Sequence, residues 1–256
     1  MKNLLVSAVG DQSLHNVWIR ERPEFDAYLI YYGDDDALAD KYTQQVPFFE
    51  RRKGTKFNML KTVMDENESF FKNYDFVFIP DDDLYLNTKG INQIFQLAHK
   101  YDLELCQPSI VGYYDVAITL HTPASLLRFT NFVEVMCPCF NSLALEKCKE
   151  TFNYSISSWG IDIWWHKIMN YPTNKFAVLD DVIAIHTRRC HGGDNYVNNV
   201  IENPWEQMNT LILEQGLSSD KIEYDRVWKE MINSYSADCY YPHIHYMVNL
   251  CETIRA

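Results

Sequence analysis

The sequence predicts an α/β protein with a mostly parallel central sheet, flanking helices and a smaller second half of mixed structure. Short, almost continuous apolar runs over 4–9 and 27–32 end at Gly10 and Gly33, as expected for strands that are covered on both faces. In the first part of the chain, such runs alternate with segments of helical spacing. Later apolar runs follow one another without an intervening helix, so we expect mixed structure there.

The first half contains four further predicted elements. Apolar residues at near-helical spacing over 57–71 predict a helix. The run 75–80 predicts a third strand, and apolar residues at i, i+3, i+4 and i+7 over 91–98 predict a second helix, capped by Thr88. The run 103–106 predicts a strand that ends at the Gln-Pro pair following it.

The second half is expected to combine strands with helices. The pattern predicts strands over 117–120, 129–136, 176–179 and 182–185, and a helix over 143–152. The remaining segment, which includes Trp205, Met208, Val227, Trp228 and Met231, is mostly helical by spacing. Neither a repeat nor a linker is evident, so we expect one domain over 1–256.

The composition disfavours several classes of protein. The 256 residues include 23 Lys and Arg against 35 Asp and Glu, which gives a net charge of −12 and argues against a nucleic-acid partner. Seven cysteines, an odd number, favour reduced thiols, and we expect Cys137 and Cys139 to be buried. Apolar runs fall short of the roughly 20 residues that span a bilayer. The expected compartment is the cytoplasm, with peripheral membrane contact left open.

The strongest chemical signal is the acidic triplet 81–83, which follows a predicted buried strand. Open α/β sheets bind ligands at this edge. Adjacent carboxylates repel one another, and a hard cation such as Mn²⁺ or Mg²⁺ relieves that repulsion, so Asp81 and Asp83 are predicted to bind a metal. The alternative is a solvated acidic loop that also caps the next helix.

Other metal sites fit the sequence less well. A calcium-binding loop starting at Asp81 needs Gly and Glu where Leu86 and Asn92 stand. A phosphatase of the aspartyl-phosphate type is disfavoured by the Leu-Tyr pair that follows Asp83. Zinc is rejected because Cys190-His191 and the histidines at 243 and 245 have no second ligand pair at the needed spacing.

Two more residues are candidates for the site. Asp162 follows Trp159-Gly160 and precedes an aromatic segment, where burial can raise the pKa of a carboxyl group as a general base requires. A helix cap is the alternative. His186 ends an apolar run and would add an imidazole to the two carboxylates of the metal site, or it is an ordinary hydrogen-bonded side chain.

Several motifs occur together in a defined order. They are Lys56, the acidic triplet with Leu84, Gln107-Pro108, the segment 132–140, Trp159 to Asp162, and Asp180 followed six residues later by His186. The set resembles a family with plant and bacterial members that is catalogued as a domain of unknown function and is similar to GT-A glycosyltransferases. The resemblance covers about 50–190. Departures are Pro80, where an aromatic is common in the family, and the cysteines flanking Pro138.

The resemblance implies a metal-dependent glycosyltransferase with a GT-A-like fold. About 1–108 would bind a nucleotide sugar, and about 109–256 would bind a glycan or glycolipid acceptor. It implies a metal held by Asp81, Asp83 and His186, with Asp162 as the catalytic carboxylate and Glu134 as the reserve base or an acceptor-binding group. Lys56 is expected to contact the diphosphate and Asp82 the ribose. A second acidic triplet over 34–36 follows Tyr32-Gly33 and is either a solvated loop or, together with Tyr32, a contact to the nucleoside.

Two alternatives remain open at this stage. One is a metal-dependent phosphotransferase or hydrolase acting on a nucleotide. The other is a non-catalytic sugar-binding protein with the same fold.

Overall fold

The structure, a computed structural model, describes residues 1–189 and 203–217, and the backbone of 224–228. The strands are β1 (Asn3–Val9), β2 (Asp26–Tyr31), β3 (Phe48–Arg51), β4 (Phe76–Phe78), β5 (Leu84–Tyr85), β6 (Leu105–Gly112), β7 (Ser125–Thr130), β8 (Cys139–Asn141), β9 (Phe176–His186) and β10 (Tyr224–Trp228). The helices are α1 (His15–Trp18), α2 (Asp36–Thr43), α3 (Lys56–Glu66), α4 (Glu68–Phe71), α5 (Thr88–Lys100), η1 (Ala117–Thr119), α6 (Ser142–Cys148), η2 (Lys149–Thr151), α7 (Ile161–Ile168) and α9 (Pro204–Glu214).

These strands form one mixed sheet in the order β10-β7-β9-β6-β8-β4-β1-β2-β3, with β5 paired to the end of β9. Strands β1 to β4 are parallel to their neighbours within that group. The antiparallel strand β8 then joins β4 to β6, and β9 runs parallel to β6 but antiparallel to β7. The first half of the sheet is therefore parallel and the second half mixed, as the sequence predicts.

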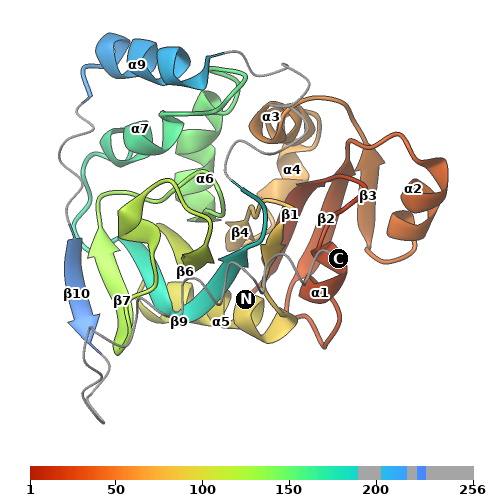
Figure 1. The fold of residues 1–256 in the computed structure, drawn as a ribbon, viewed down its shortest axis with the longest axis horizontal. Coiled ribbons are helices and arrows are strands. Elements are labelled where there is room, and N and C mark those ends of the chain that lie inside the picture. Colours follow the sequence, from red (N-terminus) through yellow and green to blue (C-terminus); the bar gives the residue numbers. More distant parts are fainter. Residues whose placement is uncertain (190–202, 218–223, 229–256) are drawn as a thin grey trace.

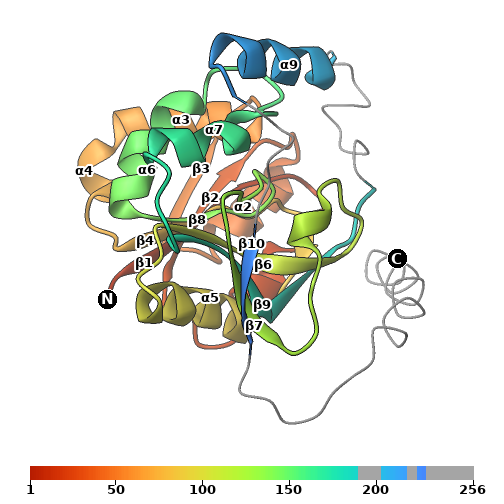
Figure 2. The same cartoon turned by 90° about the vertical axis from the view of Figure 1, so that its left-hand side faces the viewer.

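Helices cover both faces of the sheet (Figures 1 and 2). One face carries α3, α4, α6 and α7, and the other carries α5 with α1. Helix α9 packs on α7, farther from the sheet. Among the described residues, no helix combines the length and apolarity needed to cross a membrane.

The alternation of side chains along β1 explains why both faces need covering. Leu4 and Val6 belong to the apolar core under α3 and α6, whereas Leu5 belongs to the core under α5. All seven residues of this strand are buried. A strand with apolar side chains on both faces is stable only inside the sheet, and β1 accordingly lies between β2 and β4.

The structure corrects several predicted boundaries. Helix α5 is capped by Asn87, whose side chain accepts from the Gly90 N–H, and Thr88 is its first residue. Strand β6 continues through the Gln-Pro pair to Gly112. The predicted strand at 117–120 is the 3₁₀ helix η1, because its apolar run is only one turn long. The predicted strand 129–136 ends at Thr130 in β7.

Other differences concern whole elements. Strands β3, β5 and β8 are two to four residues long and were not predicted, because so short a run shows no periodicity. Val227 and Trp228 lie in β10 instead of a helix, and Met231 lies outside the described residues. The two apolar runs over 176–185 form the single strand β9.

Strand β9 contains an irregularity that is supported by a buried ion pair. Pro108 pairs with Leu179, but the next residue of β6, Ser109, pairs with Ile183. Within the extra segment, Asp180 accepts two hydrogen bonds from the Arg128 guanidinium, at 2.8 and 3.0 Å. Arg128 also donates to the carbonyl oxygens of Ile118 and Leu120 in the loop between β6 and β7. This pair therefore fixes both the irregular part of β9 and that loop.

We expect Arg128→Leu to lower the free energy of unfolding by about 3–5 kcal/mol, because it leaves the Asp180 carboxylate buried without its cation. The double variant Arg128→Leu/Asp180→Leu should lose less than the sum of the two single variants. Urea unfolding followed by circular dichroism measures both. Lys72→Ala, which breaks the exposed pair with Glu68, serves as the control and should leave the midpoint unchanged. Additive losses in the double variant would contradict the role given to the buried pair.

Candidate active site

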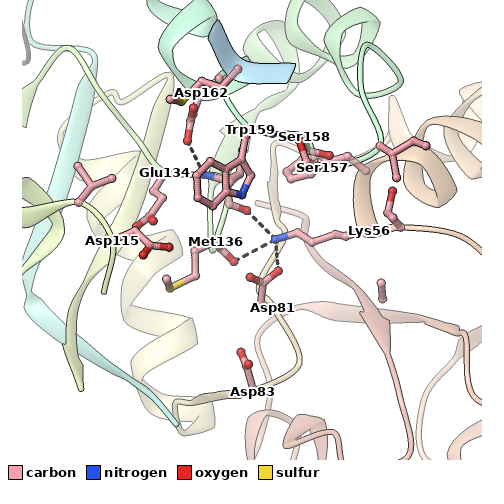
Figure 3. A pocket seen from close by; sticks show the side chains of 18 of the residues that line it. Lys56, Asp81, Asp83, Asp115, Glu134, Met136, Ser157, Ser158, Trp159 and Asp162 are labelled. Carbon is pink, nitrogen blue, oxygen red and sulfur yellow. Dashed lines mark hydrogen bonds and ion pairs between the residues drawn. The ribbon is translucent and has the colours of Figure 1, made fainter. Parts of the chain in front are cut away.

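A cavity of about 430 Å³ lies where β1, β2 and β4 end, between α3, the loop over 131–138 and the start of α7 (Figure 3). Every residue predicted for the site lines it: Tyr32, Lys56, Asp81, Asp82, Asp83, Glu134, Asp162 and His186. The carboxyl ends of parallel strands meet at one edge of the sheet, which is why residues distant in the sequence converge there. The roles of these residues remain predictions.

Asp82 is held at the ends of the first two strands. Its Oδ2 accepts from the Gly10 N–H at 2.8 Å and from the Tyr32 hydroxyl at 3.1 Å. A Cβ at Gly10 would lie 2.7 Å from the Tyr32 hydroxyl, so only glycine permits this approach. Burial and the neighbouring Asp83 raise the pKa of Asp82 to about 6, against the opposing effects of Arg188 and the Gly10 N–H.

Lys56 joins the acidic triplet to the other side of the cavity. Its ammonium group donates to Asp81 Oδ1 at 2.6 Å, to the Val135 carbonyl oxygen at 2.6 Å and to the Met136 carbonyl oxygen at 3.0 Å (Figure 3). An ammonium group has three hydrogens, so all of its donors are used. Any contact between Lys56 and a diphosphate therefore requires it to exchange one of these partners.

Asp83 and His186 meet because β5 pairs with the end of β9, placing Leu84 opposite His186. Their Oδ2 and Nε2 atoms are 3.5 Å apart. The Nδ1 atom of His186 lies 2.8 Å from the Tyr113 carbonyl oxygen, which can only accept, so Nδ1 carries a proton. The other ring nitrogen, Nε2, thus faces the carboxylate, in the orientation seen for metal-ligating histidines.

The metal site predicted at Asp81, Asp83 and His186 remains a prediction. Among the described residues, no three His, Cys, Asp or Glu side chains are grouped so that they could hold a metal ion. Asp83 and His186 lie together, whereas Asp81 is drawn to Lys56 by their ion pair. Two protein ligands fit a hard cation that takes its remaining oxygens from phosphate groups, as Mg²⁺ commonly does.

Asp162 and Glu134 form a second acidic group in the cavity. Asp162 lies in the first turn of α7 after Gly160, and it accepts from the N–H groups of Val135, at 3.3 Å, and Ile163, at 3.0 Å. Burial raises the pKa of Asp162 to about 6, and these hydrogen bonds oppose the rise. Burial and the nearby Asp162 and Asp115 raise the pKa of Glu134 to about 8.

The lining residues that sequence reasoning did not propose for the site include Asp115, Arg188 and Trp205. Asp115 lies just after β6, in the loop that Arg128 holds, and Arg188 follows β9 with its guanidinium 3.8 Å from Asp83 and 3.9 Å from Asp82. Trp205 comes from α9. The pair Arg188-Arg189 lies two residues after His186, where an apolar run ends, so the sequence could have predicted basic residues at the site. The sequence contains no comparable pattern for Asp115.

The tryptophans around Asp162 differ in their surroundings, and the two cysteines that flank Pro138 are buried. Trp165 is a core residue whose Nε1 donates to the Thr151 hydroxyl at 3.0 Å, and Trp159 lines the cavity. Cys137 and Cys139 are buried free thiols, as expected. The other cysteines and histidines considered for zinc, at 190, 191, 243 and 245, lie outside the described residues.

The raised pKa of Glu134 predicts a pH-dependent stability difference. The folded protein keeps the proton of Glu134 up to about pH 8, whereas the unfolded chain loses it near the ordinary pKa of 4.5. The contribution of this protonated group to the free energy of unfolding is therefore fully present below pH 4.5 and is lost as the pH rises towards 8. Glu134→Gln cannot lose a proton, so its stability relative to the parent should increase by at least about 1 kcal/mol between about pH 5 and pH 8. Urea unfolding at both pH values measures this. The exposed control Glu21→Gln should show no such trend, and a parallel response of both variants would contradict the assignment.

Comparison with known proteins supports the fold. No model of a known protein family matches the sequence, and no curated protein matches it. The chain is similar to residues 1–349 of TarS from S. aureus in complex with UDP-GlcNAc, with a TM-score of 0.57 and 15% identity over 84% of this chain and 66% of the TarS chain. For the same TarS fragment in complex with UDP, the TM-score is 0.52 at 12% identity, over 83% and 66% of the two chains. This chain thus spans slightly less than two thirds of that fragment. The likeness confirms the predicted GT-A-like α/β fold, while the resemblance to a particular family remains a prediction.

Proposed function

We propose that this protein transfers a sugar from a nucleotide-sugar donor to a hydroxyl group of a glycan or glycolipid. One observation carries the proposal: a single cavity of a GT-A-like fold contains an acidic triplet with cationic partners at one end and two buried carboxyl groups of different pKa at the other. The TarS structures contain UDP-GlcNAc or UDP, so UDP-sugars are the first donors to test.

The difference in pKa between Asp162 and Glu134 supports a choice of the general base. At neutral pH, a carboxyl group with a pKa near 6 is mostly ionised, whereas one with a pKa near 8 is mostly protonated. Environments that separate two pKa values in this way distinguish a base from a neutral hydrogen-bonding group. We therefore assign Asp162 as the general base that removes the proton of the acceptor hydroxyl, and Glu134 as a group that hydrogen-bonds a substrate.

The donor end is suited to a diphosphate only when its charge is balanced. Asp81, Asp82 and Asp83 would repel phosphate oxygens, and Lys56 and Arg188 compensate only part of this charge. Asp83 and His186 are the residues that would hold Mn²⁺ or Mg²⁺. Bound there, the cation would stabilise the negative charge of the departing nucleoside diphosphate.

We expect Mn²⁺ and UDP to bind cooperatively, because the ion would neutralise the repulsion between the carboxylates and the phosphates. Asp83→Asn and His186→Ala should each weaken Mn²⁺ binding in the presence of UDP by about 10- to 100-fold. Isothermal titration calorimetry of UDP with and without Mn²⁺ measures the coupling.

The matched control is Asp102→Asn, the same substitution at an exposed position of the loop after α5. It should bind like the parent. Unchanged Mn²⁺ dependence in both Asp83→Asn and His186→Ala would show that the metal, if one is used, binds elsewhere.

We expect Asp162→Asn to lower kcat by about 10²- to 10⁴-fold while the donor Kd changes little, because a positioned base contributes about that factor. The parent's kcat/KM should rise as the pH passes through about 6, where Asp162 becomes ionised, and the variant should lack this step. Asn caps a helix about as well as Asp, so a purely structural role predicts full activity.

Sugar transfer or slow donor hydrolysis, followed by product analysis with labelled UDP-sugars, supplies the rates. Activity of Asp162→Asn within a few-fold of the parent would move the search for a base to Glu134. Release of inorganic phosphate or a nucleoside monophosphate in place of UDP would instead favour a phosphotransferase or hydrolase. UDP-sugar binding without any turnover would favour a sugar-binding protein.

A further inference from the structure

The cavity has an aromatic end that the acidic triplet does not reach. Trp159, from the loop before α7, and Trp205, from α9, line it together with Ile156 and Met208. The two indole rings meet edge to face, with centroids 4.8 Å apart and an angle of 80°. Trp205 is 57% exposed and Ile156 is 50% exposed. Large apolar side chains gathered at the mouth of a polar cavity indicate a ligand-binding surface.

This aromatic end is built on a fixed support. Leu211 of α9 is fully buried, and the Gln207 side chain accepts from the Ser157 N–H at 3.1 Å. A Cβ added to Gly160 would lie 3.0 Å from Met208 Cγ, so α9 packs closely on the turn that begins α7. The tryptophans are thus held in place before any ligand arrives, which lowers the entropic cost of binding.

Next to the tryptophans, Glu134 offers a polar atom to a ligand. Within the described part of the chain, its buried Oε2 has no hydrogen-bond partner. Asp162 and Asp115 are close enough to raise its pKa. In Figure 3, these three acidic side chains lie on one side of the cavity, whereas Lys56 and Asp81 meet on the other. A buried carboxyl group that lacks a partner is costly unless a ligand supplies one.

We infer that this end of the cavity binds a neutral sugar ring as the acceptor, with its C–H face against Trp159 and Trp205 and one hydroxyl on Glu134. The inference rests on the proposed function and specifies its acceptor class. A sugar ring combines an apolar C–H face with hydroxyl groups, which matches indole rings beside a carboxyl group.

The charges at this end select against anionic acceptors. Asp115 and Asp162 would repel a phosphate or a carboxylate, and Glu134, which is mostly protonated at neutral pH, supplies no charge that would attract one. Of the basic residues that line the cavity, Lys56, His186 and Arg188 lie beside the acidic triplet. The fourth, Arg189, is the next residue in the chain after Arg188. A uronic acid or a sugar phosphate would therefore bind less tightly than the uncharged sugar of the same shape.

Saturation-transfer NMR on the full chain with bound UDP tests the inference. The probes are methyl glycosides of glucose, galactose, mannose and N-acetylglucosamine, together with methyl glucuronide, which differs from the glucoside by its carboxylate. At least one neutral glycoside should bind, and its ring C–H protons should receive the strongest saturation. Methyl glucuronide should bind at least about tenfold more weakly than the neutral glycoside that binds best.

Variants identify the surface involved. Trp205→Ala and Glu134→Ala should each weaken glycoside binding by about tenfold or more, whereas Trp205→Phe and Glu134→Gln, which keep an aromatic ring and a neutral hydrogen-bonding group, should retain much of it. Leu213→Ala, on the same helix and 81% exposed, is the matched control and should bind like the parent. Circular dichroism confirms that each variant is folded.

Several results would overturn the inference: no binding of any neutral glycoside, equal binding of methyl glucuronide, or unchanged binding in Trp205→Ala. Octyl glucoside that binds far more tightly than methyl glucoside, equally in the parent and in Glu134→Ala, would show that the surface holds a lipid chain instead. Calorimetry of UDP tests the proposed function separately. If no glycoside binds but UDP does, only the acceptor assignment is contradicted. If no UDP-sugar binds, the proposed function is contradicted.

Discussion

The three hydrogen bonds of the Lys56 ammonium hold the two sides of the cavity in one arrangement. Lys56 is the first residue of α3, and its partners are the carboxylate that follows β4 and two carbonyl groups of the loop over 131–138. That loop has no regular structure, yet it carries Glu134 and presents the Val135 N–H to Asp162. The Lys56 side chain is only 15% exposed, so losing one of these partners would be costly and its position helps to fix that of the loop.

The acidic groups at the two ends of the cavity differ in the charged and polar groups around them. The acidic triplet is surrounded by cations and donors, from Lys56, His186, Arg188 and the Gly10 N–H. At the other end, burial raises the pKa of Glu134 to about 8 and that of Asp162 to about 6. Burial also raises the pKa of Asp82 to about 6, so both ends can change charge near neutral pH, but the triplet end has ion pairs that offset part of its charge. A single cavity thus provides two electrostatic environments.

Much of the site was predictable because strand ends are visible in a sequence. The acidic triplet and His186 each follow a long apolar run, and runs that end in polar residues place those residues at a sheet edge. The metal site remains a prediction, and a pattern of acids does not reveal that Lys56 forms an ion pair with Asp81. Asp115 was missed since its place depends on the Arg128–Asp180 pair, which links segments 52 residues apart. The predicted strand over 117–120 and the part of the predicted strand over 129–136 that follows Thr130 are wrong, because loop segments also contain apolar residues.

The irregularity in β9 decides which residue arrives at the cavity. Ser109 pairs with Ile183, so β9 advances four residues while β6 advances one. With regular pairing, Gly112 would face Ile183 instead of His186. Three is an odd number, so the extra residues also exchange the two faces of the strand beyond this point. The spacing between Leu179 and His186 is thus a length constraint: inserting one residue there would put Ile185 at the position of His186, and deleting one would put Thr187 there, whereas the same change in a surface loop would leave the site intact.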